Sequence, residues 1–200
     1  MNRPTALDTH RPQIDERLKS RIGDDKSLLP QMLRYHLGWT DSSGLPLTGP
    51  LPDRLHGVLC TLAAEAAGAP LQAVIPAAAS VELLWSAYVV HRDLREGHPG
   101  RIDQPSLWWA WGHSQGINAG DALYAQARLA LMDLLISGSP PAMIVDACRS
   151  LDQGYLSLST AQCTLLALQD QDGAKPEDYV QAVRETEGAI ASTAAALGAM

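Results

Sequence analysis

Two acids and two arginines follow one another where an apolar segment ends, in the run His91-Arg92-Asp93-Leu94-Arg95-Glu96. On a helix, positions 92, 93 and 96 share one face, because residues three and four apart are neighbours. Carboxylates on one face suit a divalent cation, which needs several oxygen ligands. Guanidinium groups suit a phosphate, which they contact through paired hydrogen bonds. A third arginine, Arg101, lies in the Gly- and Pro-containing loop that follows. The run therefore predicts either a site for an anionic ligand or a solvated helix end with paired charges.

Helices must position this cluster, because the apolar residues are mostly Ala and Leu. The chain has 200 residues, 46% of them hydrophobic, and it contains no Phe. Ala and Leu favour helices, whereas strands are enriched in β-branched and aromatic residues. A chain of this length buries one sizeable core. We therefore predict an all-α protein with a single domain over residues 1–200, of which residues 1–11 are disordered.

Apolar periodicity and the positions of Gly and Pro delimit the expected helices. They are residues 12–22, 27–37, 53–68, 71–96, 115–137, 140–169 and 175–200. Asp53 is expected to cap the third helix, and Arg54 beside it is expected to be a solvated surface residue. Asn118 and Asp121 are expected in the first turn of their helix. The aromatic run Trp108, Trp109 and Trp111 is interpreted as a set of packing anchors.

Charge and cysteine content restrict the class of protein. The net charge is −7 and no basic cluster is present, which argues against a nucleic-acid partner. The N-terminal segment lacks the apolar centre of a signal peptide, and no uninterrupted apolar run is long enough to span a membrane. Cys60, Cys148 and Cys163 lie in apolar helical context and are predicted to be buried free thiols. These features favour a cytoplasmic protein.

The stretch from His91 to Asp121 resembles the first aspartate-rich region of the trans-isoprenyl diphosphate synthases, the polyprenyl synthetase family. In that family a helix ends in H-D-D-x-x-D, an R-R-G-R-P-T loop follows, and Q-A-I-N-A-G-D opens the next helix. The resemblance covers most of residues 30–200, including Arg34-Tyr35-His36-Leu37-Gly38. It implies an isoprenoid synthase-type helical bundle with an apolar tunnel and an ionic mouth, in a protein that is usually a homodimer. By the same resemblance, the chain is truncated before the second aspartate-rich motif.

The charged positions depart from the family pattern. The family's carboxylates bind magnesium, which grips the allylic diphosphate, but here Arg92 and Arg95 stand beside the retained Asp93 and Glu96. In the family the third helix opens with G-K-x-x-R, which is matched here by Pro52, Asp53 and His56. The family's cations for isopentenyl diphosphate are thus replaced by Asp53, His56 and Ile102, and Glu185 stands where a lysine is expected. The resemblance thus implies weakened magnesium binding and no ordinary chain elongation. No metal site is expected; if the chain bound a metal, Asp93 and Glu96 would be the candidate ligands.

Two functions follow as expectations. In the first, the chain is a non-catalytic, small-subunit-like partner that forms a homodimer or a heterodimer with a full-length prenyl diphosphate synthase. In the second, it is an atypical terpene cyclase or prenyltransferase that binds one prenyl diphosphate. Whether the protein is an enzyme is left open. The expected diphosphate-binding residues are Arg92, Asp93, Arg95, Glu96 and Arg101, and Tyr88, Ala87 and Leu84 are expected to line the tunnel.

Overall fold

The computed structural model describes residues 5–49, 52–102, 104–169, 173 and 175–200. In order, its helices are α1 (Ala6–Ile22), α2 (Leu28–His36), α3 (Leu55–Ala66), α4 (Leu71–Arg95), α5 (Leu107–Trp111), α6 (His113–Met132), the 3-10 turn η1 (Asp133–Leu135), α7 (Pro141–Gln169) and α8 (Pro176–Ala199). Within these described ranges no strand occurs, and the only pairings of strand type are isolated bridges. The prediction of an all-α fold is therefore confirmed.

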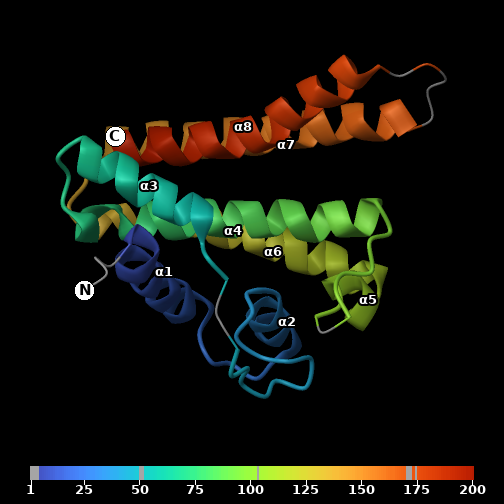
Figure 1. Cartoon of the computed structure of the whole chain (residues 1–200). Helices are drawn as coiled ribbons and strands as arrows, with labels where there is room; N and C mark the ends of the chain where they lie inside the picture. Colours follow the sequence, from blue (N-terminus) through green and yellow to red (C-terminus); the bar gives the residue numbers. More distant parts are fainter. Residues whose placement is uncertain (1–4, 50–51, 103, 170–172, 174) are drawn as a thin grey trace.

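Helix α4 is the centre of the bundle. Figure 1 shows it between the α7–α8 pair on one side and α1 and α2 on the other, with α6 alongside. Val81, Leu83, Leu84 and Ala87 of α4 are fully buried. By length and hydropathy α4 is the one helix in the described residues that would suffice to cross a membrane, but 83% of its most apolar window is buried inside the bundle. It is accordingly the core helix that carries the charged cluster at its C-terminal end.

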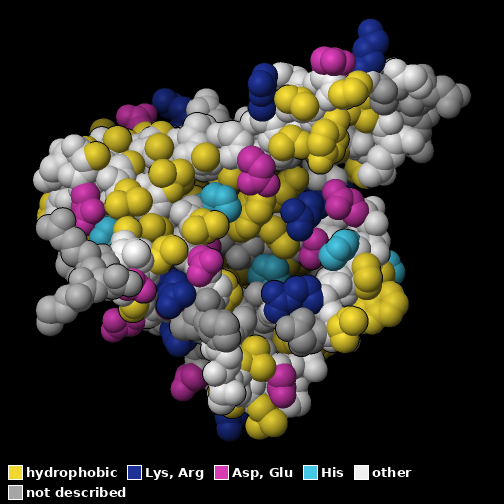
Figure 2. Space-filling model, in the orientation of Figure 1, with side chains coloured by type: hydrophobic (Ala, Val, Ile, Leu, Met, Phe, Trp, Pro, Cys, Tyr) yellow, Lys and Arg dark blue, Asp and Glu magenta, His cyan; other side chains and the backbone are white. Residues whose placement is uncertain are grey.

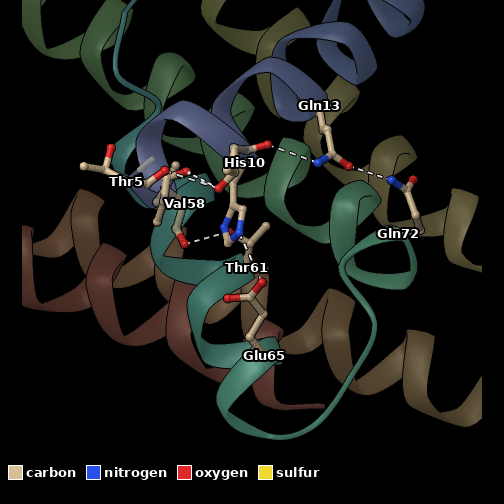
Figure 3. A network of polar contacts seen from close by, with 9 residues as sticks. Thr5, His10, Gln13, Val58, Thr61, Glu65 and Gln72 are labelled. Atoms are coloured by element: carbon tan, nitrogen blue, oxygen red, sulfur yellow. Dashed lines mark hydrogen bonds and ion pairs between the residues drawn. The ribbon is translucent and has the colours of Figure 1, made fainter. Parts of the chain in front are cut away.

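The prediction that residues 1–11 are disordered is wrong for residues 6–11, which form the first turns of α1; residues 1–4 lie outside the described part. The helix starts early because Asp8 Oδ2 accepts a hydrogen bond of 2.8 Å from the Thr5 N–H, as a residue in the first turn of a capping box does. Figure 3 shows how α1 is then fixed to α3 through His10. The Nδ1 atom of His10 lies 2.9 Å from Thr61 Oγ1, and its Nε2 atom lies 3.1 Å from Glu65 Oε1.

Arg54 is buried, contrary to the prediction of a solvated side chain. It is 6% exposed, and its Nη2 atom lies 2.9 Å from Asp15 Oδ1 and donates to the Leu37 carbonyl at 2.7 Å. Arg54 rather than Asp53 is the N-cap residue of α3, with a φ of 54° in the left-handed region. Asp53 instead pairs with Arg11 at 3.6 Å. The prediction failed because the partner of Arg54 lies on α1, far away in the sequence.

Glu82 of α4 is a second buried carboxyl near the start of α3. It is 4% exposed, and its Oε1 atom accepts a hydrogen bond of 2.7 Å from the Gly57 N–H. Burial raises the pKa of Glu82, although this hydrogen bond and the charge of Arg54 oppose the rise. The N-terminal turn of α3 is thus held from α1 and from α4 together.

The end of α8 packs against α3 through a glycine. A Cβ atom on Gly198 would lie 2.1 Å from the Cys60 carbonyl oxygen. Only a residue without a side chain allows the two backbones to approach so closely. The last turn of α8 is therefore anchored to the middle of α3.

Three smaller predictions also need correction. Helix α6 begins at His113, so Asn118 and Asp121 lie beyond its first turn. Cys60 is buried, but Cys148 is partly exposed and Cys163 is exposed. Among the tryptophans, Trp111 packs edge-on against Tyr35 at 4.9 Å between ring centroids, whereas Trp109 is 61% exposed and is not a packing anchor.

Candidate functional site

The charged cluster lies in the last turn of α4, which ends at Arg95 with Glu96 as its C-cap. Arg92 and Asp93 pair with each other, with 3.1 Å between Nη2 and Oδ1. The Arg92 guanidinium also lies over the Tyr88 ring, 6.0 Å from its centroid. Burial raises the pKa of Asp93, and the hydrogen bond and the charge of Arg92 oppose that rise. Arg92 is therefore held in place from two sides.

Glu96 is bonded to α7. Its Oε1 atom accepts a hydrogen bond of 3.0 Å from Gln162 Nε2. The Gln162 Oε1 atom in turn accepts a hydrogen bond of 2.9 Å from the Tyr88 hydroxyl. One buried side chain of α7 thus joins two positions on α4.

A cavity of about 730 Å³ opens between these residues and α8; we call it the α4–α8 cavity. Its lining residues are Tyr88, Arg92, Glu96, His98, Leu165, Leu168, Gln169, Lys175, Pro176, Tyr179, Val183, Thr186 and Glu187. Figure 2 shows basic, acidic and histidine side chains around a hollow beneath the α7–α8 hairpin. The lining combines charged side chains with aliphatic ones, so the cavity is amphipathic. Ligand sites with a polar anchor and an apolar body have this character.

A smaller cavity of about 220 Å³, the loop cavity, lies beside the first and also includes Arg92 and His98. The loop that forms it is tied to α2, because the Tyr35 hydroxyl donates to the Pro105 carbonyl at 2.6 Å. Arg101 lines this cavity. Burial, assisted by the charge of Arg54, lowers the pKa of His36 in its wall to about 4. At neutral pH the imidazole of His36 is therefore uncharged, and the two arginines supply the positive charge.

The structure separates the predicted site residues into groups. Arg92 lines both cavities, Glu96 lines the α4–α8 cavity, and Asp93 and Arg101 line the loop cavity. Arg95 is exposed and lines neither. Of the three expected tunnel residues, Tyr88 lines the α4–α8 cavity, whereas Ala87 and Leu84 are fully buried in the core and are not among its lining residues.

Sequence reasoning missed the contribution of the last helix. Lys175, Tyr179, Thr186 and Glu187 line the α4–α8 cavity. Glu185, which the sequence singled out, borders a different hollow on the other side of α8 and bonds to Gln181. Val183 and Glu187 are four residues apart and share a face, so the periodicity of α8 could have identified this wall once its facing side was known.

The carboxylates do not fit a magnesium site as they are placed. Asp93 Oδ1 is paired with Arg92 and Glu96 Oε1 is bonded to Gln162. In the described part of the chain, no group of three or more His, Cys, Asp or Glu side chains is arranged to hold a metal ion. A hard divalent cation needs several oxygen ligands in near-octahedral geometry. Arg92 moreover places a positive charge beside Asp93, which opposes the binding of a cation there.

His91 belongs to the bundle rather than to either cavity. Its Nδ1 atom lies 3.1 Å from the Tyr155 hydroxyl, and its Nε2 atom lies 3.3 Å from the Ile117 carbonyl. A Cβ atom on Gly120 would lie 2.2 Å from Nε2, so the imidazole packs directly on the backbone of α6. Both ring nitrogens of His91 therefore have hydrogen-bond partners at the rim of the core.

The outer side of α6, η1 and α7 carries an apolar groove of about 690 Å³, the α6–α7 groove. Several of its large apolar residues are exposed, among them Met132 at 43%, Val145 at 59% and Leu156 at 66%. Polar groups at its edge pair internally, since Tyr124 donates to Asp152 Oδ1 at 2.7 Å and Arg128 pairs with the other oxygen of that carboxylate. Contiguous apolar surface of this kind marks interaction sites.

Comparison with known proteins shows which family the chain resembles. The Polyprenyl synthetase family model matches residues 52–200. The (2E,6E)-farnesyl diphosphate synthase of Mycobacterium tuberculosis is 30% identical over 169 residues, which are 84% of this chain and 46% of that protein. A geranylgeranyl diphosphate synthase of the same organism is 30% identical over 172 residues, or 86% of this chain and 48% of that protein. The chain thus spans about half the length of these relatives.

Solved structures show the same fold. A polyprenyl synthetase from Streptomyces coelicolor A3(2) superposes with a TM-score of 0.87 at 27% identity, over 97% of this chain and 56% of that one. The geranylgeranyl pyrophosphate synthetase of Geoglobus acetivorans superposes with a TM-score of 0.84 at 23% identity, over 98% of this chain and 60% of that one. Because the family match covers residues 52–200 of 200, the chain belongs to the polyprenyl synthetase family.

Proposed function

We propose that this protein serves isoprenoid biosynthesis as a non-catalytic, small-subunit-like partner of an active prenyl diphosphate synthase. The observation that carries the proposal is the α6–α7 groove, whose exposed apolar side chains need a cover. The partner that fits is another chain of the same fold, either a second copy or a full-length synthase. A full-length synthase would bring the catalytic groups that this proposal assigns to the partner.

The state of the charged cluster supports a non-catalytic role. Departure of a diphosphate needs strong stabilisation of the developing negative charge, which bound magnesium would supply when present. Here both retained carboxylates of the α4 end are engaged by neighbouring side chains. We therefore propose that the chain does not elongate an allylic diphosphate with isopentenyl diphosphate.

Native mass spectrometry tests this proposal, with the protein alone and mixed with a full-length prenyl diphosphate synthase from the same source. Leu156→Glu places a charge in the α6–α7 groove, where Leu156 is 66% exposed. Leu45→Glu is a matched control, because Leu45 is 64% exposed and lies in the loop before α3. We expect the dimer mass to disappear with the first variant and to persist with the second. A monomer under all conditions would refute the proposal, as would elongation of a prenyl diphosphate by the purified chain.

We propose as a second candidate that the chain binds one prenyl diphosphate and acts as an atypical terpene cyclase or prenyltransferase. The observation that favours it is the adjacency of the two cavities at Arg92. A diphosphate would contact Arg92 and Arg101, and the hydrocarbon chain would lie against Leu165, Leu168 and Val183. Arginine suits this role because its planar fork makes paired contacts with phosphate oxygens.

Titration calorimetry with farnesyl diphosphate, with and without magnesium, tests this candidate. Arg92→Ala and Arg101→Ala should each weaken binding by about tenfold or more, in line with a charged hydrogen bond of about 1.5–3 kcal/mol. Arg184→Ala is the matched control, because Arg184 is exposed on α8 and lines neither cavity. Equal affinities for all three variants would rule out the arginine anchor.

A further inference from the structure

Gln162 of α7 lies behind the wall of the α4–α8 cavity without lining it. Its side chain is buried, with the residue only 1% exposed. Both ends of the amide are used, because Oε1 accepts from the Tyr88 hydroxyl at 2.9 Å and Nε2 donates to Glu96 Oε1 at 3.0 Å. Its two partners do line the cavity. The amide therefore acts on the cavity through other side chains.

The Glu96 carboxylate fixes which way the amide points. If the amide were reversed, its carbonyl oxygen would face a carboxylate oxygen, and neither could donate. The Gln162 Oε1 atom must then face Tyr88. The backbones of the two partners are about 12 Å apart along α4 at 1.5 Å per residue, and Gln162 joins both side chains to α7.

We infer that Gln162 is a positioning residue that sets how long a prenyl chain the α4–α8 cavity accepts, by holding the phenol of Tyr88 against α7. This rests on the proposed binding of a prenyl diphosphate. Tyr88 is 3% exposed although it lines the cavity, and its ring packs against Trp85 at 5.3 Å between centroids. The phenol hydroxyl therefore points into the bundle and leaves the cavity to the ligand.

Loss of the amide changes this position in a defined direction. A buried hydroxyl without a partner is unfavourable, because it has lost its hydrogen bonds to water. The cavity offers that water, so the Tyr88 ring turns toward it and occupies part of its depth. The cavity then no longer accommodates long prenyl chains, whereas it still accommodates short ones.

The experiment compares dissociation constants of geranyl, farnesyl and geranylgeranyl diphosphate for the full chain and its variants. Gln162→Leu should weaken the binding of geranylgeranyl diphosphate by about tenfold and leave the dissociation constant of geranyl diphosphate within about twofold of its original value. The double variant Tyr88→Phe/Gln162→Leu should restore the affinity for geranylgeranyl diphosphate, since Phe has no hydroxyl that needs a hydrogen-bond partner. Gln181→Leu is the control, because Gln181 is exposed on α8 and lines neither cavity.

A merely structural role of Gln162 would weaken all three ligands equally, and that result overturns the inference. Circular dichroism verifies that each variant is folded, and Gln162→Met, which keeps the length of the side chain, replaces Gln162→Leu if the latter does not fold. An unchanged preference with either variant also overturns the inference while the proposed ligand survives. If the unaltered protein binds none of the three ligands, the proposed ligand fails and the inference fails with it.

Discussion

Replacement of Arg54 by Met is expected to destabilise the protein strongly, although the sequence favours a surface position for this residue. The change leaves the Asp15 carboxylate, 3% exposed, without its cationic partner. The other oxygen of that carboxylate, Oδ2, is already buried without a hydrogen-bond partner within the described residues. Removal of one member of a buried ion pair costs about 3–5 kcal/mol. A domain has a total stability of about 5–15 kcal/mol, so the loss is a large part of it.

Urea unfolding followed by circular dichroism measures the effect. With a urea dependence of about 2 kcal/mol/M, the midpoint should fall by about 1.5–2.5 M. Arg149→Met is the matched control, because Arg149 makes an exposed pair with Asp146 at 3.3 Å, and such pairs contribute about 0–1 kcal/mol. The double variant Asp15→Leu/Arg54→Met should recover much of the loss, since it removes the stranded charge.

The reasoning is refuted if Arg54→Met costs less than about 1 kcal/mol, as a surface substitution does. It is also refuted if the double variant is as unstable as Arg54→Met. In that case the destabilisation would come from the left-handed backbone position or from the lost contact with the Leu37 carbonyl, not from an unpaired carboxylate.

Two further predictions concern the packing and the titration of α4. Gly120→Ala places a methyl group against His91 and should lower the free energy of unfolding by about 1–3 kcal/mol. Gly188→Ala, in open space on α8, should raise it by up to about 1 kcal/mol in the same urea assay. Similar effects of both changes would contradict the packing argument. Burial raises the pKa of Glu82 in the folded protein above its ordinary value of 4.5, so its stabilising contribution is complete below that pH and is lost as the pH rises through the folded pKa. Glu82→Gln should therefore gain stability relative to the unaltered protein as the pH rises from about 5 to 7, and a difference independent of pH would argue against a raised pKa.

The fold was readable because it depends on local signals. Predicted residues 71–96 and 140–169 correspond closely to α4 and α7, since Gly and Pro mark the ends of long apolar periods. The start of α1 was missed because residues 1–11 were judged by polarity alone, although Asp8 lies where a capping box needs an acid.

The site was only partly readable because its walls come from distant elements. The cluster at the end of α4 follows from helical spacing, and the structure indeed places Arg92 and Glu96 on one cavity. The burial of Arg54 depends on Asp15, and the orientation of Tyr88 depends on Gln162. Such pairings are set by tertiary packing, which a single sequence does not reveal.

The close contact between Gly198 and Cys60 has a practical consequence for how the protein is handled. It fixes the carboxyl end of the chain beside α3, and Figure 1 shows this end on the side of the molecule away from the C-terminal turn of α4. A tether attached after Met200 would therefore present the entrance at Arg92 outward to solution. Sensor-surface immobilisation through that terminus would leave ligand access to the α4–α8 cavity unobstructed.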